Sequence, residues 1–166
     1  MFNNFNHIIG AITIRINRKY LKIKKKPDLV FFQNNIAVGG TSNLAFIKMT
    51  GINAILDMRF EKSYNEHDLQ KYNISYLRLK VPDKKLPTND ESTHAVSWIN
   101  FQINNKKKIL IHCDLGRGRG PLMSIIYLMS QGIQKEIAIS RIKEVRKYTF
   151  LNKEQLQFIE NFHTAS

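Results

Sequence analysis

The chain has 166 residues, 43% of them hydrophobic, which predicts one globular domain with a sizeable core. Its 26 Lys and Arg against 13 Asp and Glu give a formal net charge of +13, which predicts attraction to polyanions such as phosphoproteins, phosphoinositide membranes or nucleic acid. The single cysteine excludes an internal disulfide and fits a reducing compartment. No stretch approaches the roughly 20 apolar residues of a membrane span, and the uncharged start lacks a signal peptide's basic region, so we expect a cytoplasmic protein.

The first predicted element is an amphipathic helix with a basic end, over residues 3–26. Its apolar residues share one helix face, and its basic residues follow them: Phe5, Ile8, Ile9, Ile12 and Ile16, then Arg15, Arg18, Lys19, Lys22, Lys24, Lys25 and Lys26. We expect residues 1–27 to form a unit of their own whose apolar stripe packs on the rest of the protein. The alternative is a peripheral membrane anchor that lies on anionic lipid.

Residues 28–166 are expected to form the main domain, which opens with a strand pair. Residues 29–32 and 36–38 are apolar runs separated by an Asn-Asn turn signal. A short helix follows, with Thr41 or Ser42 as its expected N-cap.

A buried parallel strand is predicted over residues 52–58. Asp57 and Arg59 stand at its end, where open α/β sheets place ligand-contacting groups, but an ion pair or a helix cap is the favoured interpretation. A short polar helix over residues 65–72 and a strand over residues 74–81 complete this part of the chain.

The second strand delivers a candidate general acid, Asp83, in the motif Val81-Pro82-Asp83. A carboxylic acid on a loop suits proton donation to a leaving oxygen. Asp90 is the runner-up, although it fits better in the acidic first turn of a helix over residues 90–104.

The most informative stretch is residues 109–121, where an apolar run ends in His112-Cys113, a glycine-rich turn follows, and Pro121 opens an apolar helix. Backbone N–H groups of such a turn, together with the helix N-terminus, suit a phosphate. The helix end and neighbouring arginines favour the thiolate form of Cys113, which makes it a candidate nucleophile. The predicted phosphate cradle consists of Asp114, Leu115, Gly116, Arg117, Gly118 and Arg119, the last gripping two phosphate oxygens with its planar fork.

Three helices are predicted after this turn, over residues 121–130, 134–147 and 153–163, the last capped by Asn152. Strands that alternate with helices predict an α/β domain with a central, mostly parallel sheet flanked by helices.

His112-Cys113, five further residues and Arg119 resemble the signature loop of the cysteine-dependent protein tyrosine phosphatases, and the short chain is similar to their compact dual-specificity branch. The resemblance implies a catalytic domain in which Cys113 attacks phosphorus, Arg119 binds phosphate oxygens, Asp83 acts as acid and then base, and a phosphocysteine forms. His112 would orient the loop and stabilise the thiolate, or would simply be satisfied by a backbone carbonyl. No metal or cofactor is expected. Similar proteins usually carry Ser or Thr after the loop arginine, whereas this chain has Gly120, which predicts slow hydrolysis of the phosphoenzyme.

The resemblance implies phosphotyrosine and phosphoserine/threonine in proteins as the first choice of substrate. Arg117, the basic N-terminal segment and the net charge suit a phosphoinositide or phospholipid headgroup, which is the closest alternative, and Asp114 counts against it. A weakly catalytic phosphate-binding module is a third possibility. We expect a monomer that acts on phosphorylated proteins, with an anionic membrane surface as a possible partner and no nucleic acid partner.

Overall fold

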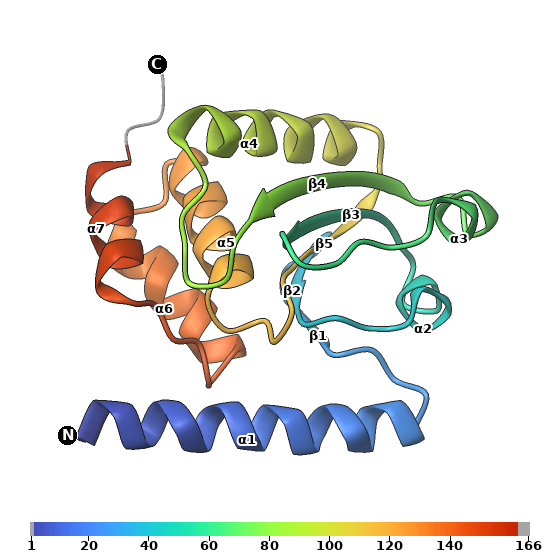
Figure 1. Ribbon diagram of the computed structural model, residues 1–166. Coiled ribbons are helices and arrows are strands. Elements are labelled where there is room, and N and C mark those ends of the chain that lie inside the picture. Colours follow the sequence, from blue (N-terminus) through green and yellow to red (C-terminus); the bar gives the residue numbers. More distant parts are fainter. Residues whose placement is uncertain (1, 163–166) are drawn as a thin grey trace.

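The computed structural model describes residues 2–162, with side chains from residue 8 onward. The side chain of Phe5 and the expected helix end at His163 therefore lie outside the described residues. Five strands form one sheet in the order β1-β2-β5-β3-β4 (Figure 1). Their bounds are Leu29–Gln33, Ile36–Gly39, Ile52–Arg59, Ser75–Val81 and Lys108–His112 for β1 to β5. Only the β1–β2 pairing is antiparallel among these strands, so the predicted mostly parallel α/β sheet is confirmed.

Helices cover both faces of the sheet. The larger core lies between the sheet and α4, α5, α6 and α7, and the smaller one between the opposite face and α2 and α3. Central strand β5 is buried on both faces, with Ile109 and Ile111 in the larger core and Leu110 in the smaller one. The helix bounds are Leu44–Lys48, Glu66–Lys71, Asn89–Asn104, Arg119–Ser130, Lys135–Val145 and Lys153–Asn161 for α2 to α7.

Two predicted helix starts are wrong by one or two residues. Helix α2 is capped by Asn43, whose side chain accepts from the amide of Ala45, because the Ser42 hydroxyl instead accepts from the amide of Asp28. Helix α5 begins at Arg119, before Pro121, because Gly118 serves as its N-cap. The arginine of the signature loop therefore belongs to the first turn of the helix.

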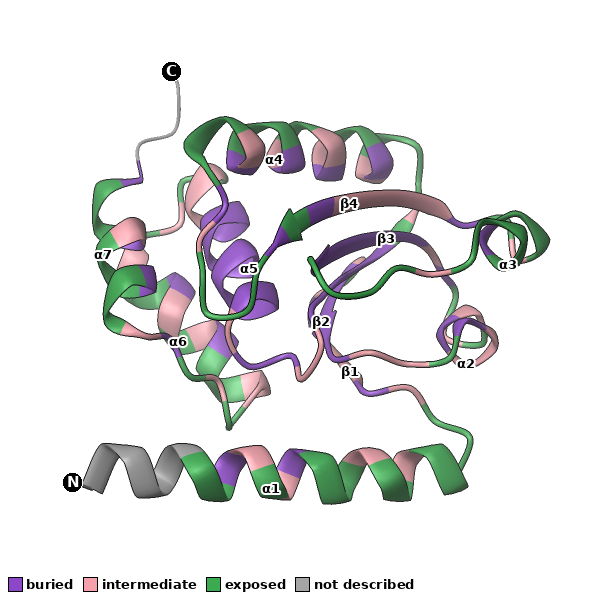
Figure 2. Cartoon of the chain, in the orientation of Figure 1, coloured by how far each residue is buried: buried purple, intermediate pink, exposed green. Residues whose placement is uncertain are grey.

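Helix α1 (Phe2–Ile23) runs across one side of the domain (Figure 1). The expectation that its apolar stripe packs on the domain is wrong: Ile8, Ile9, Ile12 and Ile16 are all exposed. A different face packs inward, on which Gly10 and Ile14 are buried (Figure 2). Within residues 2–162, no helix combines the length and hydropathy that a membrane span requires.

Candidate active site

The loop between β5 and α5 lies at the carboxyl edge of the sheet, where the ends of several strands meet. Gly39 of β2 and Asp57 of β3 both pair in register with His112, which precedes Cys113. Carboxyl ends of neighbouring parallel strands share one edge, so groups from distant parts of the sequence converge there. Cys113 is buried, and it lines a cavity of 740 Å³.

The carbonyl groups of the loop are all bonded to its surroundings. The Asp114 carbonyl accepts from the amide of Thr41, and those of Arg117 and Gly118 from the amides of Phe150 and Leu122. In a trans peptide the N–H of the next residue points away from the carbonyl. The amides of the loop therefore point to the side opposite these bonds, the arrangement of an anion-binding nest.

Arg146, at the end of α6, holds the middle of the loop. Its guanidinium donates to the carbonyls of Leu115 and Gly116, both at 3.1 Å, and pairs with the buried carboxylate of Asp28. Gly116 has a φ of +64°, and a Cβ there would lie 2.4 Å from the carbonyl oxygen of Gly39. Only glycine fits at this position, so the loop is fixed from both sides.

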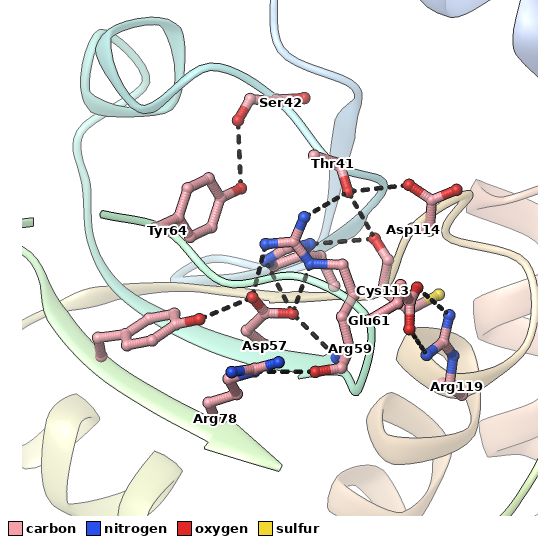
Figure 3. A network of polar contacts seen from close by, with 12 residues as sticks. Thr41, Ser42, Asp57, Arg59, Glu61, Tyr64, Arg78, Cys113, Asp114 and Arg119 are labelled. Atoms are coloured by element: carbon pink, nitrogen blue, oxygen red, sulfur yellow. Dashed lines mark hydrogen bonds and ion pairs between the residues drawn. The ribbon is translucent and has the colours of Figure 1, made fainter. Parts of the chain in front are cut away.

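Arg119 is 2% exposed, and its guanidinium contacts four oxygen atoms: two of the Glu61 carboxylate (Figure 3) and one each from Val81 and Asp83. Nη1 donates to the Val81 carbonyl at 2.8 Å and to Glu61 at 2.9 Å, and Nη2 donates to the second Glu61 oxygen at 2.9 Å. A carboxylate oxygen of Asp83 lies 3.3 Å from Nη2. The Nε group is buried and has no hydrogen-bond partner among the described residues, although buried donors are normally paired.

The Glu61 and Arg119 charges stabilise each other. Hydrogen bonds from Arg119 outweigh partial burial and lower the pKa of Glu61 to about 2. Burial would lower the pKa of Arg119, but the bonds to Glu61 and the charges of Cys113 and Asp83 raise it above its usual value. Both side chains are therefore ionised near neutral pH, and Glu61 fixes the plane of the guanidinium.

Asp83 lies on the loop after β4, beside the Arg119 guanidinium and on the wall of the Cys113 cavity. Its side chain is 73% exposed. The other predicted acid, Asp90, is exposed in the first turn of α4, where Thr88 and Glu91 form the capping box. The structure thus brings Cys113, Arg119 and Asp83 together and leaves Asp90 out.

His112 is fully buried behind Cys113. Its Nδ1 contacts the Cys113 carbonyl at 3.0 Å, which requires the ring nitrogen to donate. Burial lowers the pKa of His112 to about 4, although the nearby Asp57 carboxylate opposes this shift, so the ring is neutral at pH 7. The interpretation of a histidine satisfied by a backbone carbonyl therefore fits the observed contact, which also holds the cysteine backbone in place.

Asp57 and Arg59 form the favoured ion pair, which is buried at 2.6 Å. Arg59 also donates to the Thr41 hydroxyl at 3.0 Å, and that hydroxyl lies 3.3 Å from the Asp114 carboxylate and 3.4 Å from the Cys113 carbonyl (Figure 3). The strand end thus supports the phosphate loop through Thr41.

Two of the three charged residues of the predicted cradle, Asp114 and Arg117, make side-chain contacts outside the loop. Asp114 interacts with Thr41 and, at 3.7 Å, with Arg18 of α1. Arg117 is buried, and its Nε donates to the Tyr148 carbonyl at 2.9 Å. Burial and the nearby charge of Arg15 lower the pKa of Arg117 below its usual value. Arg15 and Arg117 both line the cavity, which gives it a positive wall.

Sequence reasoning missed Glu61, Thr41 and Arg146. Glu61 stands two residues beyond the end of β3, so the rule that strand ends carry site residues could have found it. No sequence pattern points to Arg146, because its partners Leu115, Gly116 and Asp28 are distant from it in the sequence. Among the residues with described side chains, no three His, Cys, Asp or Glu groups cluster so as to hold a metal ion.

A parallel strand, a Cys-(five residues)-Arg loop and a following helix, with an aspartate beside the arginine, define the class of cysteine-dependent phosphatases. The sequence model of the dual specificity phosphatase catalytic domain matches residues 36–164. The chain belongs to this family and is therefore a phosphoric monoester hydrolase of the protein-tyrosine and dual-specificity phosphatase class.

Known proteins agree with this assignment. The chain is 26% identical over 118 residues to the PRL-1 phosphatase of Drosophila melanogaster, an alignment that covers 70% of this chain and 66% of that protein, just under two thirds. Its fold is similar to Tk-PTP in the active form, with a TM-score of 0.75 and 21% identity over 82% of this chain and 96% of that one. It is also similar to PTPMT1 in complex with PI(5)P, with a TM-score of 0.73 and 17% identity over 81% and 94%.

Proposed function

We propose that residues 28–166 hydrolyse phosphate monoesters on tyrosine and on serine or threonine of proteins, through a phosphocysteine on Cys113. The observation that carries this proposal is the buried Nε of Arg119, which lacks an acceptor although it belongs to the turn that follows Cys113. A phosphate oxygen supplies that acceptor. A second oxygen replaces Asp83 on Nη2, which frees the carboxyl of Asp83 for proton transfer.

In the first step the Cys113 thiolate attacks phosphorus as the bond to the ester oxygen breaks. Asp83 gives its proton to the leaving oxygen, so an alcohol or phenol departs and a sulfur–phosphorus bond remains. The inward amides of residues 115–119 and Arg119 stabilise the charge on the transferred phosphoryl group. Glu61 keeps the guanidinium in the plane that this contact needs.

In the second step water attacks the phosphocysteine. The Asp83 carboxylate accepts a proton from that water, the sulfur–phosphorus bond breaks, and inorganic phosphate and the thiolate are released. His112 acts as a positioning residue, because its ring holds the Cys113 carbonyl and stays neutral over the working pH range. We propose that residues 114–119 bind the phosphate through their backbone amides. Arg119 also binds it through its side chain.

The preference for protein substrates is supported by aromatic side chains at the cavity. Phe60 and Phe150 line it and are 57% and 37% exposed, so each offers an apolar contact to a phosphotyrosine ring. Lys84 and Arg117 also line the cavity and suit acidic residues that flank a phosphorylated site.

A phosphoinositide headgroup is the second candidate, favoured by a specific observation. Arg15, Lys84 and Arg117 place three further cations on the cavity wall, beyond those needed for one phosphate. The similarity in fold to a PTPMT1 structure that contains PI(5)P is consistent with this alternative.

The test compares phosphate release from phosphotyrosine and phosphothreonine peptides with release from phosphoinositide vesicles. Cys113→Ser should abolish turnover on every substrate, and Asp83→Asn should lower kcat by roughly 10² to 10⁴. Asp90→Asn is the matched control, because it removes an exposed acid that lies outside the cavity, and it should leave kcat unchanged. Acid-quenched enzyme should carry one phosphoryl group on Cys113.

If the enzyme turned over only the phosphoinositide vesicles, the proposed substrate would be the lipid and not a phosphorylated protein. If no substrate turned over while Cys113→Ser still bound phosphopeptide, the chain would be a phosphate-binding module, and the catalytic proposal would fail.

A further inference from the structure

Helix α1 has two opposite faces with different surroundings. The inner face packs on the domain through Gly10, Ile14 and Leu21, and Arg18 donates to the Thr41 carbonyl at 3.3 Å. Along the same helix Ala11 and Arg15 line the cavity that holds Cys113. One side of α1 is therefore part of the wall beside the phosphate loop, and its orientation on the domain is set by these contacts.

The opposite side, here named the outer face of α1, is apolar and exposed. Its five large side chains recur every three or four residues along 22 helical residues and so form one stripe. They are 44–78% exposed: Ile9, Ile12, Ile16, Tyr20 and Ile23. Soluble proteins rarely leave so continuous an apolar stripe uncovered, so the outer face is suited to a partner.

The charge of α1 indicates what that partner is. Residues 1–27 contain no Asp or Glu and seven Lys or Arg. Arg15, Lys19 and Lys22 are positioned along one edge of the stripe and Lys24 along the other. Two copies of this helix packed stripe to stripe would bring like charges together, which disfavours self-association. An anionic lipid surface meets both the apolar stripe and the positive edges.

We propose that the outer face of α1 is a membrane-docking surface that lies flat on anionic phospholipid, with its apolar side chains at the acyl boundary and its basic side chains among the headgroups. Docking holds the cavity beside the headgroup layer, because Arg15 contributes both to the cavity wall and to the basic edge. This surface binds lipid whether or not the proposed phosphatase reaction occurs.

The test is sedimentation of the full chain with phosphatidylcholine vesicles, with and without phosphatidylserine. The parent should bind only the vesicles that contain phosphatidylserine, and added salt should weaken binding. The double variant Ile12→Ser/Ile16→Ser should lower the partition coefficient by at least about tenfold. Ile137→Ser is the matched control, because Ile137 on α6 is 49% exposed, as is Ile12, and its variant should bind like the parent.

A second readout separates docking from folding and from catalysis. Turnover of p-nitrophenyl phosphate in solution should be the same in the double variant and the parent, since neither isoleucine lines the cavity. Equal vesicle binding by parent and double variant would overturn the proposal, as would failure of the parent to bind. A parent dimer in sedimentation velocity that Ile12→Ser/Ile16→Ser dissociates would instead assign the outer face to a second copy.

Discussion

Gly120 stands on the first turn of α5, directly behind the cysteine. A Cβ at this position would lie 3.3 Å from the Cys113 amide nitrogen and 3.3 Å from the His112 Cα. A serine here would place its Cβ against the Cys113 backbone, and we expect its hydroxyl to reach the Cys113 sulfur and donate to it as the phosphocysteine breaks. Gly120→Ser should speed the second step of the reaction and leave the first step unchanged.

The magnitude follows from two opposing effects. A hydrogen bond to a charged group contributes about 1.5–3 kcal/mol, which corresponds to roughly 10- to 150-fold in rate. The contact at 3.3 Å requires the surrounding backbone to shift slightly, which costs on the order of 1 kcal/mol. We therefore expect steady-state turnover to rise about tenfold.

Rapid mixing with p-nitrophenyl phosphate measures both steps. The parent should release a burst of one nitrophenolate per active site before a slower steady phase, and Gly120→Ser should raise the steady rate and shrink the burst. Gly120→Ala is the control, since it adds the Cβ without the hydroxyl. Identical steady rates in the serine and alanine variants, or a parent without a burst, would refute the reasoning.

Three further predictions concern the groups around the loop. Arg146→Met leaves the Asp28 carboxylate buried and unpaired, so the free energy of unfolding in urea should fall by about 3 kcal/mol. Adding Asp28→Asn to the Arg146→Met variant should recover part of this lost stability. A loss below about 1 kcal/mol in Arg146→Met would contradict the pairing. Burial lowers the pKa of His112 from 6.5 to about 4, so the unfolded chain binds a proton that the native ring does not. The free energy of unfolding should therefore fall by about 2 kcal/mol from roughly pH 7 to pH 5, and His112→Asn should reduce this pH dependence. The same pH dependence in parent and variant would contradict a buried, neutral His112. Glu61→Gln loosens Arg119 and should lower kcat/KM for a phosphate monoester about tenfold, whereas an unchanged value would show that Glu61 does not position the guanidinium.

The signature loop and the sheet could be predicted because their signals are local. Cys113 and Arg119 are close in sequence, and an apolar run such as residues 109–111 is buried on both faces wherever the sheet forms. The Asp57–Arg59 pair was predictable for the same reason. Helix starts were less certain, because Thr41, Ser42 and Asn43 are all good caps, and only the bond from the Asp28 amide to Ser42 selects among them.

The orientation of α1 could not be predicted from periodicity. Spacing identifies which residues share a helix face, but the neighbouring surface decides which face packs inward. Gly10 allows the helix to approach closely, since a Cβ there would lie 2.9 Å from Arg117 and 3.2 Å from the Tyr148 ring. The contact thus depends on two side chains far along the sequence, about which the helix itself carries no information.

The ion pair between Asp28 and Arg146 joins residues 118 positions apart. Closing so long a segment costs chain entropy that one pair cannot offset, so the pair forms only after the sheet has brought its ends together. Because Arg146 also holds Leu115 and Gly116, we expect the phosphate loop to acquire its final shape late in folding. During synthesis, a chain whose Arg146 has not yet emerged from the ribosome therefore exposes a cysteine without an ordered anion site, and we expect its nucleophilic reactivity to switch on only when the whole domain is complete.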